Sequence, residues 1–252
     1  MKAKEIIALM ESKAEVSGDT CDKLICGDEN KEIKKLGVTM FATAELIKKA
    51  IADGYDMLIV HEPVFYCLSD EEESLVKEKR KLIEEGGLVI YLNHDHLHNT
   101  LPDGINEGER FFLGLQGECS GKVLTLKESI SPLDLARRAK YGLGVSQARV
   151  VGNREVPVSR YGMFFGSYLN RDTIKAFIND EVDCIITGEV CEYSLCEYVR
   201  DANYLGRRKA LVVLGHIGSE RDGMRYFALK LGEELKPLTV NYLECDEVYS
   251  LV

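Results

Sequence analysis

The sequence predicts an α/β protein with largely parallel strands. Short apolar runs, each about as long as a buried strand, recur along the chain. Segments with apolar residues at helical spacing separate these runs, and glycine or a capping residue marks many of the junctions. Regular alternation of strands and helices is typical of sheets whose parallel strands are joined by helices.

Strands are expected where a short apolar run ends in turn residues. The predicted strands are 23–26, 38–41, 57–60, 88–92, 122–126, 148–151, 161–165, 182–187, 210–214 and 238–243. Helices are expected between most of them. The first helix is amphipathic, and its apolar face contains Ala3, Ile6, Ile7, Met10 and Ala14.

Capping residues predict where several helices begin. Thr43 precedes a segment with a regular apolar face and is expected to cap it. Ser69 with Glu72 forms a capping-box pattern before a highly charged helix. Ser131 followed by Pro132 combines a cap with a first-turn proline. These signals predict three helix starts independently of the apolar pattern.

The bulk composition excludes some classes of function. The chain has 42 acidic and 32 basic residues, and its formal net charge of −10 argues against strong nucleic-acid binding. No apolar run approaches the length of a membrane span, so no membrane partner is expected. The eight cysteines form no CxxC pair and the first residues lead into an amphipathic helix. We therefore expect reduced thiols in a cytoplasmic protein.

The five histidines are confined to three short stretches, and each stretch directly follows a predicted strand. They are His61, His94, His96, His98 and His216. After His61 come Glu62 and Pro63, and proline cannot continue a central strand, so the chain is expected to turn there. Because sites in open α/β sheets form at the carboxyl ends of strands, the three stretches favour one shared metal site.

The spacing of His94, His96 and His98 leaves two arrangements open. In an extended segment all three side chains point the same way. If the chain turns after Asn93, only one or two of them reach a common point. A polar surface loop without a bound ion is a further interpretation of the segment.

Two further acids lie near His216 or after another predicted strand. His216 and Glu220 are four residues apart, so they share one face if a helix begins at or just after His216. Glu189 follows the predicted strand 182–187 and is a candidate general base or a residue that orients a ligand. A solvated loop acid is the alternative for Glu189.

The candidate ligands together suit a dinuclear transition-metal centre. They are His61, Glu62, His98, His216 and Glu220, with His94 and His96 as further candidates. Nitrogen and oxygen donors of this kind suit Zn, Mn, Fe or Co. Two divalent ions would share a bridging carboxylate and activate a water molecule as a nucleophile. Glu220 and Glu189 are the candidate catalytic residues.

Four segments resemble the Nif-three-like dinuclear metal proteins, also known as GTP cyclohydrolase I type 2 homologues. The segments are 58–65, 91–99, 183–189 and 215–220, and the likeness extends over nearly the whole chain. The family has a second histidine where this chain has Glu62, and an aspartate ligand where this chain has His98. His216 and Glu220 match the last two ligands of the family. The two departures offset each other, so the number of imidazoles and carboxylates is unchanged.

The resemblance implies an architecture and two classes of function. It implies two α/β lobes, expected at 1–122 with 206–252 and at 123–205, and a ring-shaped homohexamer. It favours a metal-dependent hydrolase acting on a small phosphorylated or nucleotide-like substrate. The alternative is a non-catalytic metalloprotein, either a metal carrier or an interaction scaffold. No segment is typical of a guanine pocket or a phosphate-binding glycine loop, so GTP cyclohydrolase activity is not assumed.

Overall fold

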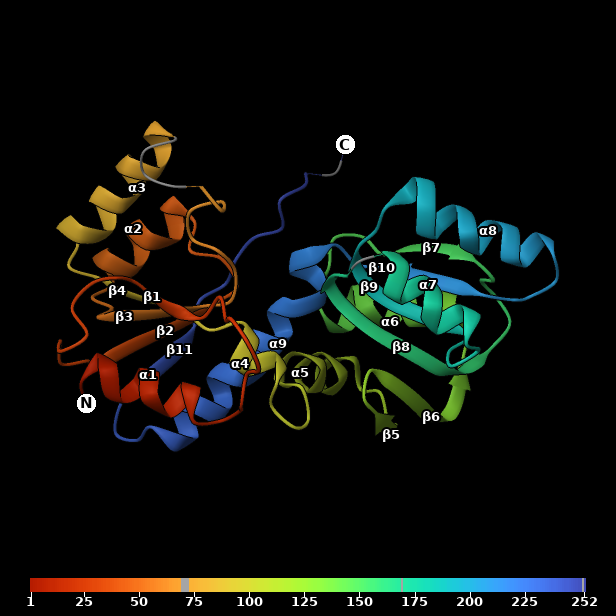
Figure 1. Ribbon diagram of the computed structural model, residues 1–252, viewed down its shortest axis with the longest axis horizontal. Coiled ribbons are helices and arrows are strands. Elements are labelled where there is room, and N and C mark those ends of the chain that lie inside the picture. Colours follow the sequence, from red (N-terminus) through yellow and green to blue (C-terminus); the bar gives the residue numbers. More distant parts are fainter. Residues whose placement is uncertain (69–72, 169, 251) are drawn as a thin grey trace. The chain divides into compact units, whose positions relative to one another are not determined.

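The computed structural model describes residues 1–68, 73–168, 170–250 and 252. They form two compact α/β units, drawn in sequence colours in Figure 1. Unit 1 comprises Met1–Ile105 and Gly223–Cys245, and unit 2 comprises Asn106–Asp222 and Asp246–Val252. In the part of the chain that is described, no helix is both long and apolar enough to cross a membrane.

The sheet of unit 1 has five strands in the order β1-β4-β3-β2-β11. Their bounds are Lys23–Cys26 (β1), Lys35–Thr39 (β2), Met57–Val60 (β3), Val89–Leu92 (β4) and Thr239–Tyr242 (β11). Strands β4, β3, β2 and β11 are parallel, and β1 lies antiparallel to β4. The predicted parallel arrangement is therefore confirmed for this sheet except at β1.

Helices cover both faces of the unit 1 sheet. In Figure 1, α2 (Ala44–Ala52) and α3 (Ser74–Glu85) lie above it, and α1 (Ala3–Glu11) lies below it. Leu58 and Val60 belong to the apolar core that α2 and α3 share. Tyr91 instead reaches α1, where its hydroxyl donates to Glu11 at 3.3 Å. Burial on both faces explains why β3 and β4 are continuous apolar runs.

Two of the three predicted helix starts are confirmed. The Thr43 hydroxyl accepts a hydrogen bond from the Leu46 amide at 3.1 Å. Ser131 caps α6 (Pro132–Gly142) by accepting from the Asp134 amide, also at 3.1 Å. The capping box predicted at positions 69 and 72 lies outside the described residues. Helix α3 begins at Ser74.

The sheet of unit 2 has six strands in the order β5-β6-β8-β9-β10-β7. Their bounds are Gly117–Ser120 (β5), Val123–Ile130 (β6), Arg149–Gly152 (β7), Val158–Ser167 (β8), Cys184–Glu189 (β9) and Ala210–Val213 (β10). Only β8, β9 and β10 are parallel to one another, so the sheet is mixed and the parallel prediction holds for its centre.

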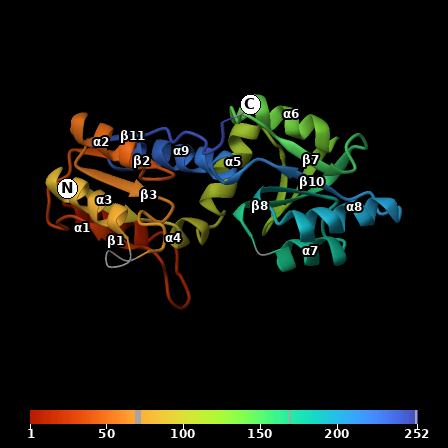
Figure 2. The ribbon, with the colours of Figure 1, turned by 90° about the horizontal axis from the view of Figure 1, so that it is seen from above.

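Helices also cover both faces of the unit 2 sheet. Figure 2 shows α6 on one face, and α7 (Asn170–Ile178) and α8 (Glu197–Tyr204) on the other. The short π-helix η1 (Glu192–Cys196) leads into α8. The boundaries of the units differ from the division expected at 122 and 206. Two of the observed boundaries fall inside the helices α5 (Gly104–Leu113) and α9 (His216–Glu234). Strand β10 was expected in the first lobe, but it pairs within the sheet of unit 2.

Candidate metal centre

Two parallel strand ends bring the first two histidine stretches together. Val60 at the end of β3 is opposite Leu92 at the end of β4. The Asn93 amide donates to the Val60 carbonyl at 2.9 Å, which continues the pairing one residue further. The His61 amide donates to the Met40 carbonyl at 3.2 Å. Both histidine loops therefore leave the same edge of the unit 1 sheet.

A single helical turn selects two of the three clustered histidines. Residues Asp95–His98 form α4, and the His98 amide donates to the His94 carbonyl at 3.1 Å. These two histidines are four residues apart, so they lie on one face of the turn. His96 is displaced from that face, and its Nδ1 lies 2.7 Å from Asp22 Oδ2. The extended arrangement of the segment is therefore wrong, and the turned alternative occurs.

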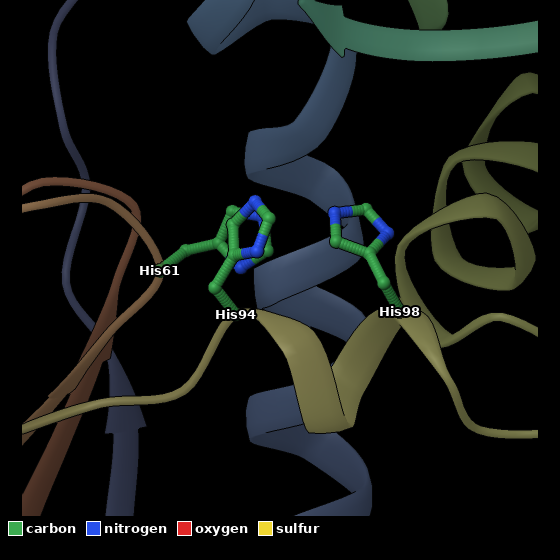
Figure 3. A group of neighbouring side chains, drawn as sticks. All are labelled: His61, His94 and His98. Carbon is green, nitrogen blue, oxygen red and sulfur yellow. The ribbon is translucent and has the colours of Figure 1, made fainter. Parts of the chain in front are cut away.

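The rings of His61, His94 and His98 gather at one point, as Figure 3 shows. The ring centroids are 4.6 Å apart for His61 and His94, 5.0 Å for His61 and His98, and 4.8 Å for His94 and His98. One ring nitrogen from each histidine lies within 4.8 Å of the other two. His61 is fully buried, and the other two are half-buried. We call these three residues the histidine cluster.

Each ring of the histidine cluster has an oxygen acceptor at Nδ1. The acceptors are the Asn93 carbonyl for His61 at 3.4 Å, Asp95 Oδ1 for His94 at 2.9 Å, and Asp103 Oδ2 for His98 at 3.1 Å. A neutral imidazole that donates through Nδ1 carries its lone pair on Nε2, which is the form that ligates metals. The donor set of the cluster therefore fits a divalent transition metal.

Asp22, in the loop before β1, holds the start of α4, the single turn Asp95–His98 that we call the histidine turn. Its Oδ1 accepts from the amides of His94 at 2.7 Å and Asp95 at 2.8 Å, and its Oδ2 accepts from the His96 amide at 2.9 Å. The side chain of Asp22 is fully buried, so its charge is balanced by these donors at the helix start. Sequence reasoning missed Asp22, because an acid beside a predicted strand is a common feature.

Glu62 lies beside the histidine cluster. Its amide donates to the Met40 carbonyl at 3.1 Å, and the residue is half-buried. One of its carboxylate oxygens lies within 4.8 Å of a ring nitrogen of His61. Unit 1 thus brings together three of the predicted ligands, His61, Glu62 and His98. It also brings in His94, one of the two further candidates. His96 is not part of this group.

The other candidate residues lie in unit 2, around the first turn of α9. His216 Nε2 is 3.1 Å from Glu220 Oε2, as expected for two residues four apart on a helix. Glu189, the last residue of β9, places its Oε1 2.8 Å from His216 Nδ1. Glu220 is buried against Gly166, where an added Cβ would come within 2.3 Å of Glu220 Oε1. Unit 2 therefore gathers an imidazole and two carboxylates.

The outer side of the histidine turn is anionic. Burial opposes ionisation of Asp95, but hydrogen bonds from the Cys21 amide, His94 and Thr20 outweigh it and hold the pKa of the Asp95 carboxyl well below its usual range. Cys21 is exposed as a residue, but partial burial of its thiol and the charges of Asp95 and Asp22 raise the pKa of that thiol to about 12. These surroundings favour a cation over an anion.

The fold and the histidine cluster define a two-unit α/β protein with a site whose donors suit a transition metal. The chain belongs to the Duf34/NIF3 (NGG1p interacting factor 3) family, whose sequence profile matches residues 1–247. The resemblance seen in the four sequence segments is thereby confirmed.

Relatives and solved structures cover nearly the whole chain. A GTP cyclohydrolase 1 type 2 homolog from Clostridium acetobutylicum is 23% identical over 96% of this chain and 93% of its own length. One from Methanocaldococcus jannaschii is 26% identical, over 93% and 96%. The Staphylococcus aureus protein SA1388 has a TM-score of 0.81 at 15% identity, over 100% and 99%. Reduced HcgD from Methanocaldococcus jannaschii has a TM-score of 0.78 at 24% identity, over 97% and 98%. The structural likenesses show the fold.

Proposed function

We propose that the protein is a metal-dependent hydrolase with two divalent transition-metal ions, and that it acts on a small phosphorylated or nucleotide-like substrate. Imidazole nitrogens and carboxylate oxygens make Zn, Mn, Fe and Co the candidate metals. A bound ion would supply Lewis acidity for the hydrolysis. The relatives' name, which refers to a GTP cyclohydrolase, agrees with a nucleotide-like substrate class.

The proposal rests above all on the convergence of three imidazoles that are each oriented through Nδ1. Catalytic zinc sites commonly have three protein ligands and keep one coordination position open, whereas structural sites are closed by four. His61 is held by its backbone contact at the strand end and is fully buried. His94 and His98 are half-buried, so the histidine cluster is partly exposed to solvent.

We assign roles to the remaining candidate residues from their contacts and from the family resemblance. We assign His216 and Glu220 as further metal ligands. Glu62 supplies the carboxylate that the family has at the position of His98. Glu189 contacts His216 Nδ1, and this contact supports a role in orienting that ring. A catalytic role for Glu189 or Glu220 stays a prediction.

The proposal is tested by stripping the purified protein of metal and reloading it with Zn, Mn, Fe(II) or Co. We expect two ions per chain and hydrolysis of phosphomonoesters or nucleotides that depends on the metal. His98→Ala and His216→Ala should each lower the metal content. His96→Asn is the matched control, because an asparagine amide can still donate to Asp22 in place of the imidazole.

Each outcome has a defined meaning. Two bound ions without hydrolysis of any substrate in a broad panel would favour the metal carrier or scaffold. A protein that retains no metal after reloading would contradict both functions. Loss of metal in His96→Asn equal to that in His98→Ala would show that the histidine cluster has been wrongly assigned.

A further inference from the structure

A second group of donor atoms lies beside the histidine cluster, closer to solvent. Ligand atoms of Cys21, His94 and Asp95 all lie within 4.8 Å of one another. Cys21 is exposed, and the side chains of His94 and Asp95 are 34% and 27% exposed. This outer group therefore differs from the histidine cluster both in its donors, which include a thiol, and in its access to solvent.

Hydrogen bonds from two chain segments fix the outer group in place. Asp95 Oδ2 accepts from the Cys21 amide at 2.9 Å and from the Thr20 hydroxyl at 3.0 Å. Asp95 Oδ1 lies 2.9 Å from His94 Nδ1. Asp95 also accepts from the Cys21 thiol, so its fourth lone-pair site becomes available to a cation when that thiol loses its proton to bind the metal. The Cys21 thiol is held nearby, since Sγ lies 3.7 Å from Asp22 Oδ1.

We propose that Cys21, His94 and Asp95 form a capture site for a thiophilic divalent metal such as Zn or Co, from which the ion passes to the histidine cluster. The passage of the ion to the histidine cluster rests on the proposed function, whereas the capture site itself is independent of it. A thiolate with an imidazole and a carboxylate suits Zn or Co, and a soft sulfur ligand disfavours Mg, Ca and Mn. The Cys21 thiol gives its proton to solvent as the sulfur–metal bond forms, and takes one up when the ion leaves.

His94 is common to both groups, which provides the route. The donors run from exposed Cys21, through half-buried His94, to fully buried His61. In the outer group the ion binds His94 Nδ1, whose proton moves by way of solvent to Nε2, and the His94 ring turns with the ion as Cys21 and Asp95 are exchanged for His61 and His98. This exchange replaces ligands one at a time, so the ion never loses its whole coordination shell in the interior, where desolvation is most costly.

Cobalt absorbance tests the capture site directly. Stripped, reduced protein is titrated with Co²⁺ while absorbance is recorded in the near ultraviolet, where cobalt–thiolate charge transfer absorbs. We expect the wild-type protein to show this band transiently, while the ion is still bound by Cys21, and Cys21→Ser to lack it. Cys119→Ser is the matched control, because Cys119 is an exposed cysteine of unit 2 and its loss should leave the band unchanged. In stopped-flow loading, Cys21→Ser should fill more slowly but reach the same final metal content.

The outcomes separate this inference from the proposed function. Absence of the band in both the wild type and His61→Ala, or its persistence in Cys21→Ser, would overturn the capture site. Equally fast loading of Cys21→Ser would overturn the passage of the ion from that site to the histidine cluster. His61→Ala should keep the band, since His61 belongs only to the histidine cluster, while its final metal content falls. A wild-type protein that shows the band but retains no metal after dialysis would count against the proposed function, because only the outer site would then be present.

Discussion

Asp22 and Asp95 each bind the backbone segment that carries the other. The Asp22 carboxylate accepts from the Asp95 amide at 2.8 Å, and the Asp95 carboxylate accepts from the amide of Cys21, next to Asp22, at 2.9 Å. The two acids therefore tie the loop before β1 to the histidine turn in both directions. The donors around each carboxylate, which are backbone amides and the Thr20 hydroxyl, stabilise its charge.

We expect Asp22→Asn to loosen the histidine turn. An amide has one oxygen acceptor, so it cannot replace both carboxylate oxygens that serve the amides of His94, Asp95 and His96. The free energy of unfolding should fall by about 1–3 kcal/mol, and metal content should fall with it. Asp19→Asn is the control, since Asp19 is exposed in the same loop. Equal stability of the two variants in urea titrations would contradict the anchoring role.

The exchanged pair Glu62 and His98 predicts a non-additive double variant. Glu62→His alone should weaken the second metal ion by removing a negative charge, and His98→Asp alone should add a charge and distort the ligand geometry. Glu62→His with His98→Asp rebuilds the usual family set. We expect it to recover two-metal binding better than either single change, because ligands of one site are coupled. Metal stoichiometry and affinity of the three variants provide the measurement.

The opposite result for the exchanged pair would have a clear meaning. If both single changes are harmless, or if their losses simply add in the double variant, Glu62 and His98 do not serve one site. Their shared proximity to His61 would then be a packing relationship only.

Gly166→Ala should disturb the group that His216, Glu220 and Glu189 form in unit 2. Gly166 has a φ of +73°, and an added Cβ would come within 2.3 Å of Glu220 Oε1. Gly206→Ala is a close control, because Gly206 has a φ of +84° but nothing within 4 Å of the added atom. Both variants bear the left-handed backbone strain of about 1–2 kcal/mol, but only the first must also displace a carboxylate. We expect Gly166→Ala alone to lose metal. Equal metal content in both would show that Glu220 is not a ligand.

Lys79 predicts a pH dependence of stability in unit 1. The residue is only 5% exposed, its Nζ donates to the Val64 carbonyl at 2.6 Å, and burial lowers the pKa of its ammonium from the usual 10.5 to about 8. Between these values the unfolded chain binds more protons than the folded one, so stability rises with pH. Lys79→Met should remove a rise of about 3 kcal/mol between pH 8 and 10.5, since each pH unit by which the pKa is lowered corresponds to about 1.4 kcal/mol.

The readout for Lys79 is the slope and not the stability at one pH, because the substitution also removes a hydrogen bond. Lys77→Met serves as the control, since Lys77 is exposed on the same helix, α3. Urea unfolding of the three proteins across this pH range gives the three slopes. A wild-type slope that survives in Lys79→Met would show that other groups cause it.

The family resemblance also predicts a multimer, most simply a hexamer. Light scattering on the purified protein should then give a mass several times that of the 28.3 kDa chain. A mass near that of one chain at all concentrations would contradict the prediction.

Much of unit 1 could be predicted from its sequence because its central strands are buried on both faces. Such strands appear as continuous apolar runs, and the runs at β3 and β4 placed His61 and the second histidine stretch at strand ends. Strand β5 could not be found this way, because three of its four residues are exposed and it has no apolar pattern. The mixed pairing of unit 2 was missed because the apolar pattern of a strand carries little information about its direction, and the internal strand β6 is antiparallel to both of its neighbours.

The arrangement of the histidine ligands could not be predicted from the local sequence pattern alone. Residues 94–98 fit both an extended segment and one helical turn, and the choice depends on Asp22, whose carboxylate holds the three amides at the start of α4. That contact joins residues 72 positions apart, so spacing within the histidine stretch cannot reveal it. Cys21 became part of the outer group for the same reason, because β1 lies beside β4 in space.

The position of β11 has a consequence for biosynthesis. Strand β11 (Thr239–Tyr242) is the parallel neighbour of β2 (Lys35–Thr39), so the first sheet is completed by a strand that is made long after β2. All of unit 2 up to Asp222 leaves the ribosome in between. Throughout that interval β2 has one unpaired edge, and exposed strand edges promote association between chains. We therefore expect chains of this protein to associate more readily before β11 is made than after it.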